Sequence, residues 1–151
     1  MSIRNLDKIF NPTRVAVIGA SDAPASVGYT VLRNLIGSGF AGVVYPVNSK
    51  RESVQGIQAY KNIASLPHAP DLAVICTPAP SVPELIRLLG EAGTRGIVII
   101  SAGFREVGES GRGVRGVGAV AVARERGGVP RFGLVQLTGG VIDRLVGGVG
   151  G

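Results

Sequence analysis

Hydrophobic residues form short continuous runs that alternate with segments of helical periodicity. Four runs are apolar almost throughout, which is typical of parallel strands covered on both faces: Arg14–Gly19, Gly42–Val47, Asp71–Cys76 and Gly96–Ile100. Apolar positions recur at helical spacing from Val27 to Ile36 and from Val82 to Leu89, and glycines end both segments. Shorter helical stretches are predicted over Ser2–Phe10 and Tyr60–Leu66.

This alternation predicts an α/β fold, a Rossmann-like open parallel sheet with helices on both faces. In such sheets, ligands bind beyond the carboxyl ends of the strands. The loops that follow Gly19 and Val47, and those that open at Thr77 and Ser101, are therefore expected to meet at one edge.

The glycine turn after the first strand is typical of a phosphate site. The sequence from Val15 to Gly28 reads VAVIGASDAPASVG, a strand that runs through a turn into a helix. A helix N-terminus offers unpaired N–H groups and a partial positive charge to an anion. The next glycine after Gly19 is Gly28, so the nicotinamide dinucleotide fingerprint G-x-G-x-x-G is absent. Ser21 and Ser26 offer hydroxyl donors to a ligand, or they cap the helix that begins near Val27.

The second strand ends without the carboxylate that NAD-binding proteins place there for the ribose hydroxyls. Asn48 and Ser49 are followed instead by Lys50 and Arg51. Cations at this corner suit a ribose that carries its own phosphate, as in NADP or coenzyme A. Lys50 is the preferred phosphate contact and Arg51 a second one; the alternative is that both are solvent-facing charges at a strand end.

The third strand leads into Thr77-Pro78-Ala79-Pro80. Two prolines fix φ and remove N–H donors, which makes a stiff apolar edge. This edge suits an adenine or a pantetheine arm, or it is simply the loop that joins a strand to the next helix.

Composition narrows the class of protein. The net charge of +6 comes from scattered residues, and only 5% of residues are aromatic, so nucleic acid is not the favoured partner. The single cysteine, Cys76, excludes an internal disulfide framework and indicates a reducing compartment. No apolar run is long enough to span a membrane, and we expect a cytoplasmic protein. His68 is expected on the surface, and no catalytic set or metal-ligand spacing emerges.

From Gly108 onward the chain changes character, because this stretch holds fourteen of the 24 glycines. Glycine destabilises a helix interior by about 1 kcal/mol relative to alanine, so any helix here would be poor. Two interpretations are open: a flexible basic tail, or a reading frame lost over part of residues 109–140. An Arg/Gly-rich segment also raises the hypothesis of a regulatory or single-strand nucleic-acid-binding protein.

Several ordered motifs resemble the N-terminal CoA-binding domain of NDP-forming acyl-CoA synthetases. This family includes ADP-forming acetyl-CoA synthetases, protein acetyltransferases that fuse the module to an acetyltransferase domain, and more distantly the succinyl-CoA synthetase α subunit. The resemblance covers about residues 6–111 and rests on Leu6–Pro12, Val15–Ser21, Tyr45–Asn48, Asp71–Ile75 with Pro78-Ala79, and Ser101–Glu106.

The resemblance implies a coenzyme A or acyl-CoA site and no catalysis by the isolated chain. In the family, ATP-grasp and phosphohistidine-bearing domains or subunits complete the ligase reaction. The remaining alternative is the NADP-binding domain of a reductase. The residues implied to contact the cofactor are Gly19, Ala20, Ser21, Ser26, Val27, Gly28, Asn48, Lys50, Pro78, Ala79, Ile100, Ser101 and Ala102.

Two departures from the family pattern stand out. Ser49 replaces the usual proline after Val47-Asn48, and the segment Phe132–Gly139 lacks the expected Gly-Pro-Asn-Cys-type turn. Gly140–Asp143 then resembles the family again, as a shifted and later restored frame would produce. We expect a CoA-binding Rossmann-like domain over residues 1–135 and an irregular glycine-rich tail over 136–151.

Overall fold

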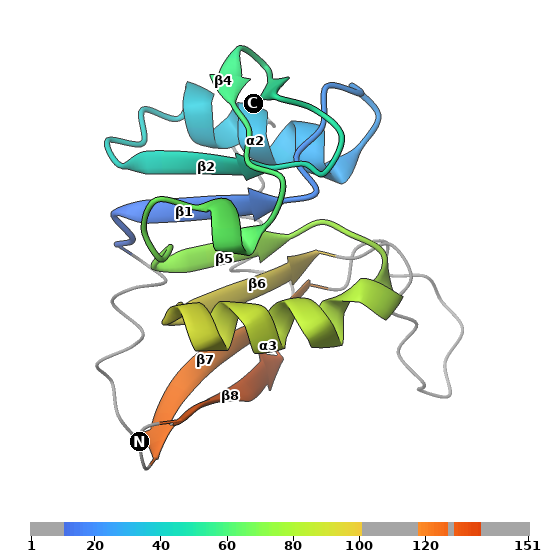
Figure 1. Ribbon diagram of the computed structural model, residues 1–151. Helices are drawn as coiled ribbons and strands as arrows, with labels where there is room; N and C mark the ends of the chain where they lie inside the picture. The colour runs from blue at the N-terminus through green and yellow to red at the C-terminus, as the bar shows by residue number, and fades with distance from the viewer. Residues whose placement is uncertain (1–10, 101–117, 127–128, 137–151) are drawn as a thin grey trace.

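The computed structural model describes residues 11–100, 118–126 and 129–136. The predicted helix at Ser2–Phe10 lies outside these residues. Two α-helices and two 3-10 helices accompany eight strands in the described part of the chain (Figure 1). In chain order they are β1 (Arg14–Ile18), α2 (Val27–Gly37), β2 (Val43–Val47), β3 (Ser53–Val54), β4 (Ile57–Gln58), η2 (Ile63–Ser65), β5 (Leu72–Ile75), η3 (Ala79–Ser81), α3 (Val82–Ala92), β6 (Gly96–Ile100), β7 (Gly118–Arg126) and β8 (Val129–Gln136).

The main sheet has the strand order β2-β1-β5-β6-β7-β8, and its first four strands are parallel. The four predicted strands are confirmed: the ends of three of them shift by one residue at most, and the fourth, Gly96–Ile100, is observed with the predicted bounds. The crossover connections place the carboxyl ends of β1, β2 and β5 together, at the edge toward which their arrows point in Figure 1.

The sheet is not parallel throughout, because β7 pairs antiparallel with β6 and with β8. Neither the prediction of a parallel sheet nor that of a flexible tail from Gly108 accounts for these two strands. An antiparallel pair needs only a short turn and no crossover helix, so it forms where the sequence has no helical periodicity. Residues 137–151, most of the predicted tail, lie outside the described residues.

Two layers of apolar side chains hold helices against opposite faces of the sheet, as the sequence predicts. Alternate residues of β1 belong to different layers, since neighbouring side chains on a strand point to opposite faces. Ile18 packs with Ile75 and with Leu89 of α3, whereas Val17 packs with Leu32 of α2. Ala16, Val17, Leu32, Ile75 and Leu89 are fully buried.

The segment after β4 is extended where the sequence predicts a helix over Tyr60–Leu66. Tyr60 forms a parallel bridge with Val47: its amide donates to the Pro46 carbonyl at 2.9 Å, and its carbonyl accepts from the Asn48 amide at 2.9 Å. These bonds hold Tyr60 beside β2. Only η2 is helical, and it begins after Asn62, whose side chain accepts a hydrogen bond from the Ser65 amide at 2.9 Å.

Candidate functional site

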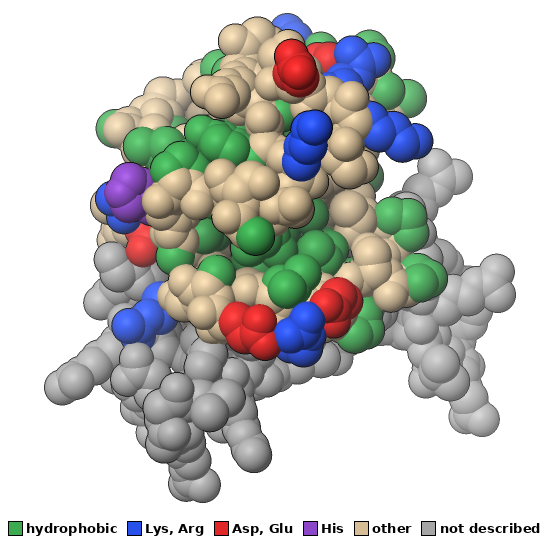
Figure 2. All heavy atoms as spheres, in the orientation of Figure 1, with side chains coloured by type: hydrophobic (Ala, Val, Ile, Leu, Met, Phe, Trp, Pro, Cys, Tyr) green, Lys and Arg blue, Asp and Glu red, His purple; other side chains and the backbone are tan. Residues whose placement is uncertain are grey.

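A cleft of about 440 Å³ lies at the carboxyl edge of the parallel strands. Figure 2 shows hydrophobic side chains in a hollow above α3, with cationic side chains on the surface above it. Loops after β1, β2 and β5, the segment around η2, and one face of α3 contribute to the cleft. Its lining residues are Ile18, Gly19, Ala20, Ser21, Val47, Asn48, Ser49, Lys50, Lys61, Asn62, Ile63, Thr77, Ser81, Leu85 and Leu88.

The turn after β1 is built by two glycines. Gly19 has a φ of +87°, which a residue with a Cβ rarely adopts, and it lies against Cys76 and Thr77 of the neighbouring loop. Gly28 is buried in the first turn of α2, where a methyl group would overlap the Gly19 carbonyl. Gly28 therefore lets α2 pack directly on the turn, and it does not line the cleft.

Backbone hydrogen bonds fasten this turn to the end of β2. The amides of Gly19 and Ala20 both donate to the Val47 carbonyl, at 3.0 and 3.3 Å. Both amides are thus used within the fold. Ser21 has the first amide along the loop that makes no hydrogen bond to another described residue, so it is the first that a ligand can use.

The two serines of the loop have different roles. Ser26 caps α2: its hydroxyl accepts from the Tyr29 amide at 3.1 Å and donates to the Ala23 carbonyl at 2.9 Å. Its single hydroxyl hydrogen is therefore occupied. The Ser21 hydroxyl accepts from the Ala23 amide at 3.0 Å and keeps its hydrogen for a ligand. Ser21 lines the cleft, and neither Ser26 nor Val27 does.

Asn48 joins the two loops that form one side of the cleft. Its Nδ2 donates to the Ala20 carbonyl at 2.8 Å, and its Oδ1 accepts from the amides of Lys50 and Arg51 at 2.8 and 3.1 Å. All three bonds require an amide side chain, which both donates and accepts. Asn48 therefore fixes the backbone from which Lys50 extends.

Hydrogen bonds of Asp22 and Gln55 hold the loop that follows β1 against the segment that follows β2. Asp22 accepts from the Gln55 amide at 2.7 Å and from the Arg51 guanidinium at 3.1 Å. The Gln55 side chain donates to the carbonyls of Ser21 and Tyr29. The ion pair with Asp22 directs Arg51 toward this loop, and Arg51 does not line the cleft.

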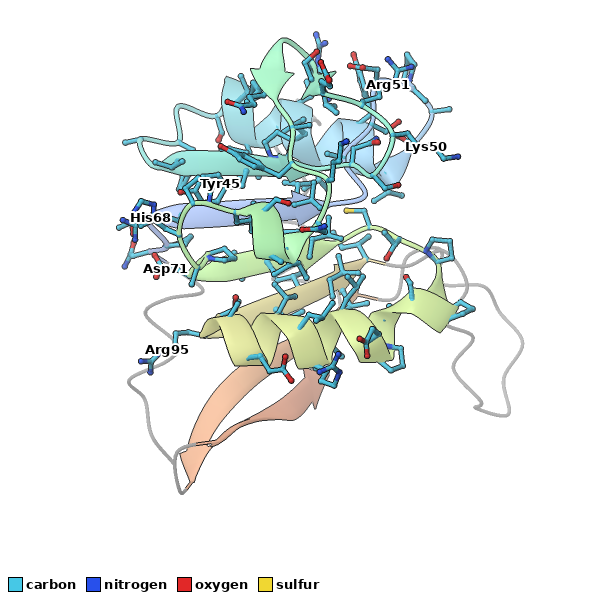
Figure 3. The ribbon with its side chains drawn as sticks, in the orientation of Figure 1. Tyr45, Lys50, Arg51, His68, Asp71 and Arg95 are labelled. Atoms are coloured by element: carbon cyan, nitrogen blue, oxygen red, sulfur yellow. The ribbon has the colours of Figure 1, made fainter. Side chains whose placement is uncertain are left out.

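His68 lies at the edge of the sheet opposite the cleft. Figure 3 places Lys50 and Arg51 at the carboxyl edge, and His68, Asp71 and Arg95 at the other. His68 is exposed, as predicted. Its distance from the cleft removes it from any chemistry there.

The loop after β5 contributes differently from the prediction. Pro78 is exposed and is not among the residues that line the cleft, and the side chain of Ala79 lies outside the described part of the structure. The apolar wall comes instead from Leu85 and Leu88 of α3. Thr77 and Ser81 line the cleft, and their hydroxyl oxygens lie 2.7 Å apart.

Of the three cofactor contacts predicted at the end of β6 and just after it, the structure describes only Ile100. Ile100 is half-buried and packs against the core layer on the α2 side, outside the cleft. Ser101 and Ala102 lie outside the described residues.

Sequence reasoning missed Lys61, Asn62, Leu85 and Leu88. Leu85 lies within the apolar periodicity predicted from Val82 to Leu89, and it both packs against the core and borders the cleft. Lys61 and Asn62 lie within the stretch Tyr60–Leu66 that the sequence predicts as helical, and only the pairing of Tyr60 with Val47 brings them to the carboxyl edge.

Cys76 does not supply a reactive thiolate. Burial raises the pKa of its thiol to about 12. Within residues 11–100 and the two described C-terminal strands, no three His, Cys, Asp or Glu side chains gather where they could hold a metal ion. None of the helices in these same ranges has the length and apolar character needed to cross a bilayer.

Comparison with known proteins shows that most of the chain is similar to part of several acyl-CoA synthetases. The chain is 48% identical over 107 residues to the α subunit of ADP-forming acetate–CoA ligase II from Pyrococcus furiosus, which covers 71% of this chain and 23% of that protein. It is 44% identical over 110 residues to a trans-feruloyl-CoA synthase from an unknown prokaryotic organism, covering 73% and 16%. The chain thus spans a quarter or less of the length of these relatives.

Solved structures share the same fold. A crystal structure of a protein from Pyrococcus horikoshii OT3 matches with 49% identity and a TM-score of 0.64, covering 69% of this chain and 24% of that one. The dinucleotide-forming acetyl-coenzyme A synthetase 1 of Ca. Korarchaeum cryptofilum, in complex with phosphate and ADP, matches with 41% identity and a TM-score of 0.64 over 68% and 22%. The CoA binding domain family matches residues 13–129. The chain therefore belongs to the CoA binding domain family and is homologous to the N-terminal region of ADP-forming acetyl-CoA synthetases.

Proposed function

We propose that the chain binds coenzyme A or an acyl-CoA in the cleft at the carboxyl edge of its sheet. The observation that carries this proposal is the chemistry of the described lining residues, which include two lysines, no carboxylate, and an apolar wall from α3. Such a cleft attracts a ligand that combines several negative charges with an uncharged arm. Coenzyme A has this character.

The parts of the cleft suggest how the ligand lies. Lys50 extends from the loop that Asn48 fixes, where dinucleotide-binding folds place the ribose hydroxyls, so we assign it to the ribose phosphate. The Ser21 amide, and the hydroxyl hydrogen that Ser21 keeps, would donate to the neighbouring pyrophosphate. Leu85 and Leu88 offer an apolar surface to the adenine or the pantetheine arm.

The named relatives support this choice of ligand. Their names share CoA but differ in the acid, which is acetate in one and trans-ferulate in another. A segment at 44–48% identity to both is better suited to the shared ligand than to the acid that differs. We infer that the acid is bound outside this domain.

The chemistry of the whole ligase requires more than this domain. Within the described residues the cleft lining has no histidine, carboxylate or cysteine, so its serine and threonine hydroxyls have none of these groups beside them to act as a general base. We propose that this chain supplies the CoA site. ATP-grasp and phosphohistidine-bearing domains or subunits, or an acetyltransferase domain, would supply the reaction.

Isothermal titration calorimetry with CoA, dephospho-CoA and NADPH tests this function. We expect CoA to bind, and Lys50→Gln to weaken CoA about tenfold while leaving dephospho-CoA unchanged, because only CoA carries the ribose phosphate. Arg51→Gln is the matched control, since its guanidinium is held by Asp22. Binding of NADPH without binding of CoA would support the reductase alternative and overturn the proposal.

A further inference from the structure

We propose that Lys61 is a second phosphate-binding residue and holds the pyrophosphate of the ligand, while Lys50 holds the ribose phosphate. This inference rests on the proposed CoA site and adds a specificity-determining residue to it. The cleft would then prefer ligands that carry two separated anionic groups.

The position of Lys61 follows from backbone pairing. Tyr60 is bridged to Val47, with hydrogen bonds to both Pro46 and Asn48 at 2.9 Å. The chain at Tyr60 therefore runs parallel to the end of β2. The next residue, Lys61, emerges at the same carboxyl edge as Asn48 and lines the same cleft as Lys50.

The positive charge of Lys61 is available to an anionic ligand. Lys50 and Lys61 are both exposed, and neither has an ion-pair partner among the described residues. The third cation nearby, Arg51, is paired with Asp22. Both cations line one cleft, so an anionic ligand that spans it can be attracted to both.

The backbone explains why the pyrophosphate needs a side-chain cation. In many phosphate sites the amides of the glycine turn hold the phosphate. Here the amides of Gly19 and Ala20 donate to the Val47 carbonyl instead. Ser21 offers the pyrophosphate an amide and a hydroxyl but no positive charge, and Lys50 is assigned to the other anionic group. Among the lining residues that the structure describes, Lys61 is the remaining cation.

Calorimetry with CoA and dephospho-CoA tests the assignment, because both ligands contain the pyrophosphate. We expect Lys61→Gln to weaken both ligands by the same factor, about tenfold, and to reduce the salt dependence of binding. Lys61→Arg should restore most of the affinity. The control Arg33→Gln removes the same charge from an exposed position outside the cleft, and should leave both affinities nearly unchanged.

Two outcomes would overturn the assignment while the CoA site itself stands. In one, Lys61→Gln binds both ligands as tightly as the wild type. In the other, it loses affinity for CoA alone, which would place Lys61 at the ribose phosphate. Failure of the wild type to bind either ligand would instead refute the proposed function. Circular dichroism and thermal melting should show a folded variant, since Lys61 is exposed.

Discussion

Gly28, in the first turn of α2, lies so close to Gly19 that any side chain on Gly28 would overlap the Gly19 carbonyl oxygen. The two residues are nine positions apart, and their contact sets how closely the helix approaches the turn after β1. Because Gly19, Ala20 and Ser21 line the cleft, this contact also shapes the ligand site.

We expect Gly28→Ala to destabilise the fold by about 3 kcal/mol, because the methyl group meets backbone atoms that cannot rotate away. Chemical denaturation measures this loss. Gly37→Ala is the matched control in the same helix, where a methyl group meets nothing within 4 Å and should be neutral or slightly stabilising. Equal stability of the two variants would contradict the close contact.

Asn48→Asp separates the two functions of the Asn48 side chain. The carboxylate can still accept from the amides of Lys50 and Arg51, but it cannot donate to the Ala20 carbonyl. It also adds negative charge beside the proposed phosphate site. We expect a stability loss of about 1–2 kcal/mol and a CoA affinity at least roughly tenfold weaker by calorimetry. Unchanged CoA affinity would argue against an anion site at this corner.

Asp71 fastens the opposite edge of the sheet, far from the cleft (Figure 3). Its Oδ2 accepts from the amide and the hydroxyl of Thr13 at 2.9 and 2.6 Å, and from the Arg14 amide at 3.3 Å. We expect Asp71→Ala to lower the free energy of unfolding by about 2 kcal/mol and to leave the CoA affinity of the folded protein unchanged. A weakened affinity in the folded variant would show that the two edges are coupled.

Cys76 makes stability depend on alkaline pH. Burial raises the pKa of its thiol from 9.0 to about 12, so the folded state keeps a proton that the unfolded chain loses. Below about pH 9 the thiol is protonated in both states, and its contribution to the free energy of unfolding is fully present. As the pH rises from 9 toward 12, the free energy of unfolding falls by roughly 1 kcal/mol per pH unit.

Urea denaturation at several alkaline pH values, compared between wild type and Cys76→Ala, isolates this contribution. The wild type should lose more stability than the variant as the pH rises. At pH 8, the native thiol should also react with iodoacetamide far more slowly than the unfolded one. Parallel pH profiles and equal reactivity would contradict a buried thiol.

Much of the fold could be predicted because its signals are local. The apolar runs around Val17 and Val98 identify strands covered on both faces, and the periodicity from Val27 and from Val82 identifies helices with correct starts. Ser26 was recognised as a possible cap, which is now its observed role. The hairpin of β7 and β8 was missed, although alternating valine and alanine before Gly127-Gly128 is a hairpin pattern.

The sequence by itself determined the layered sheet, the glycine turn and the cation at Lys50, because each depends on neighbours a few positions away. Only the tertiary structure decided that Lys61 joins Lys50 in one cleft, that Leu85 and Leu88 form its apolar wall, and that Val47 occupies the amides of the turn. These relationships arise from the pairing of distant segments, which no local pattern of residues encodes.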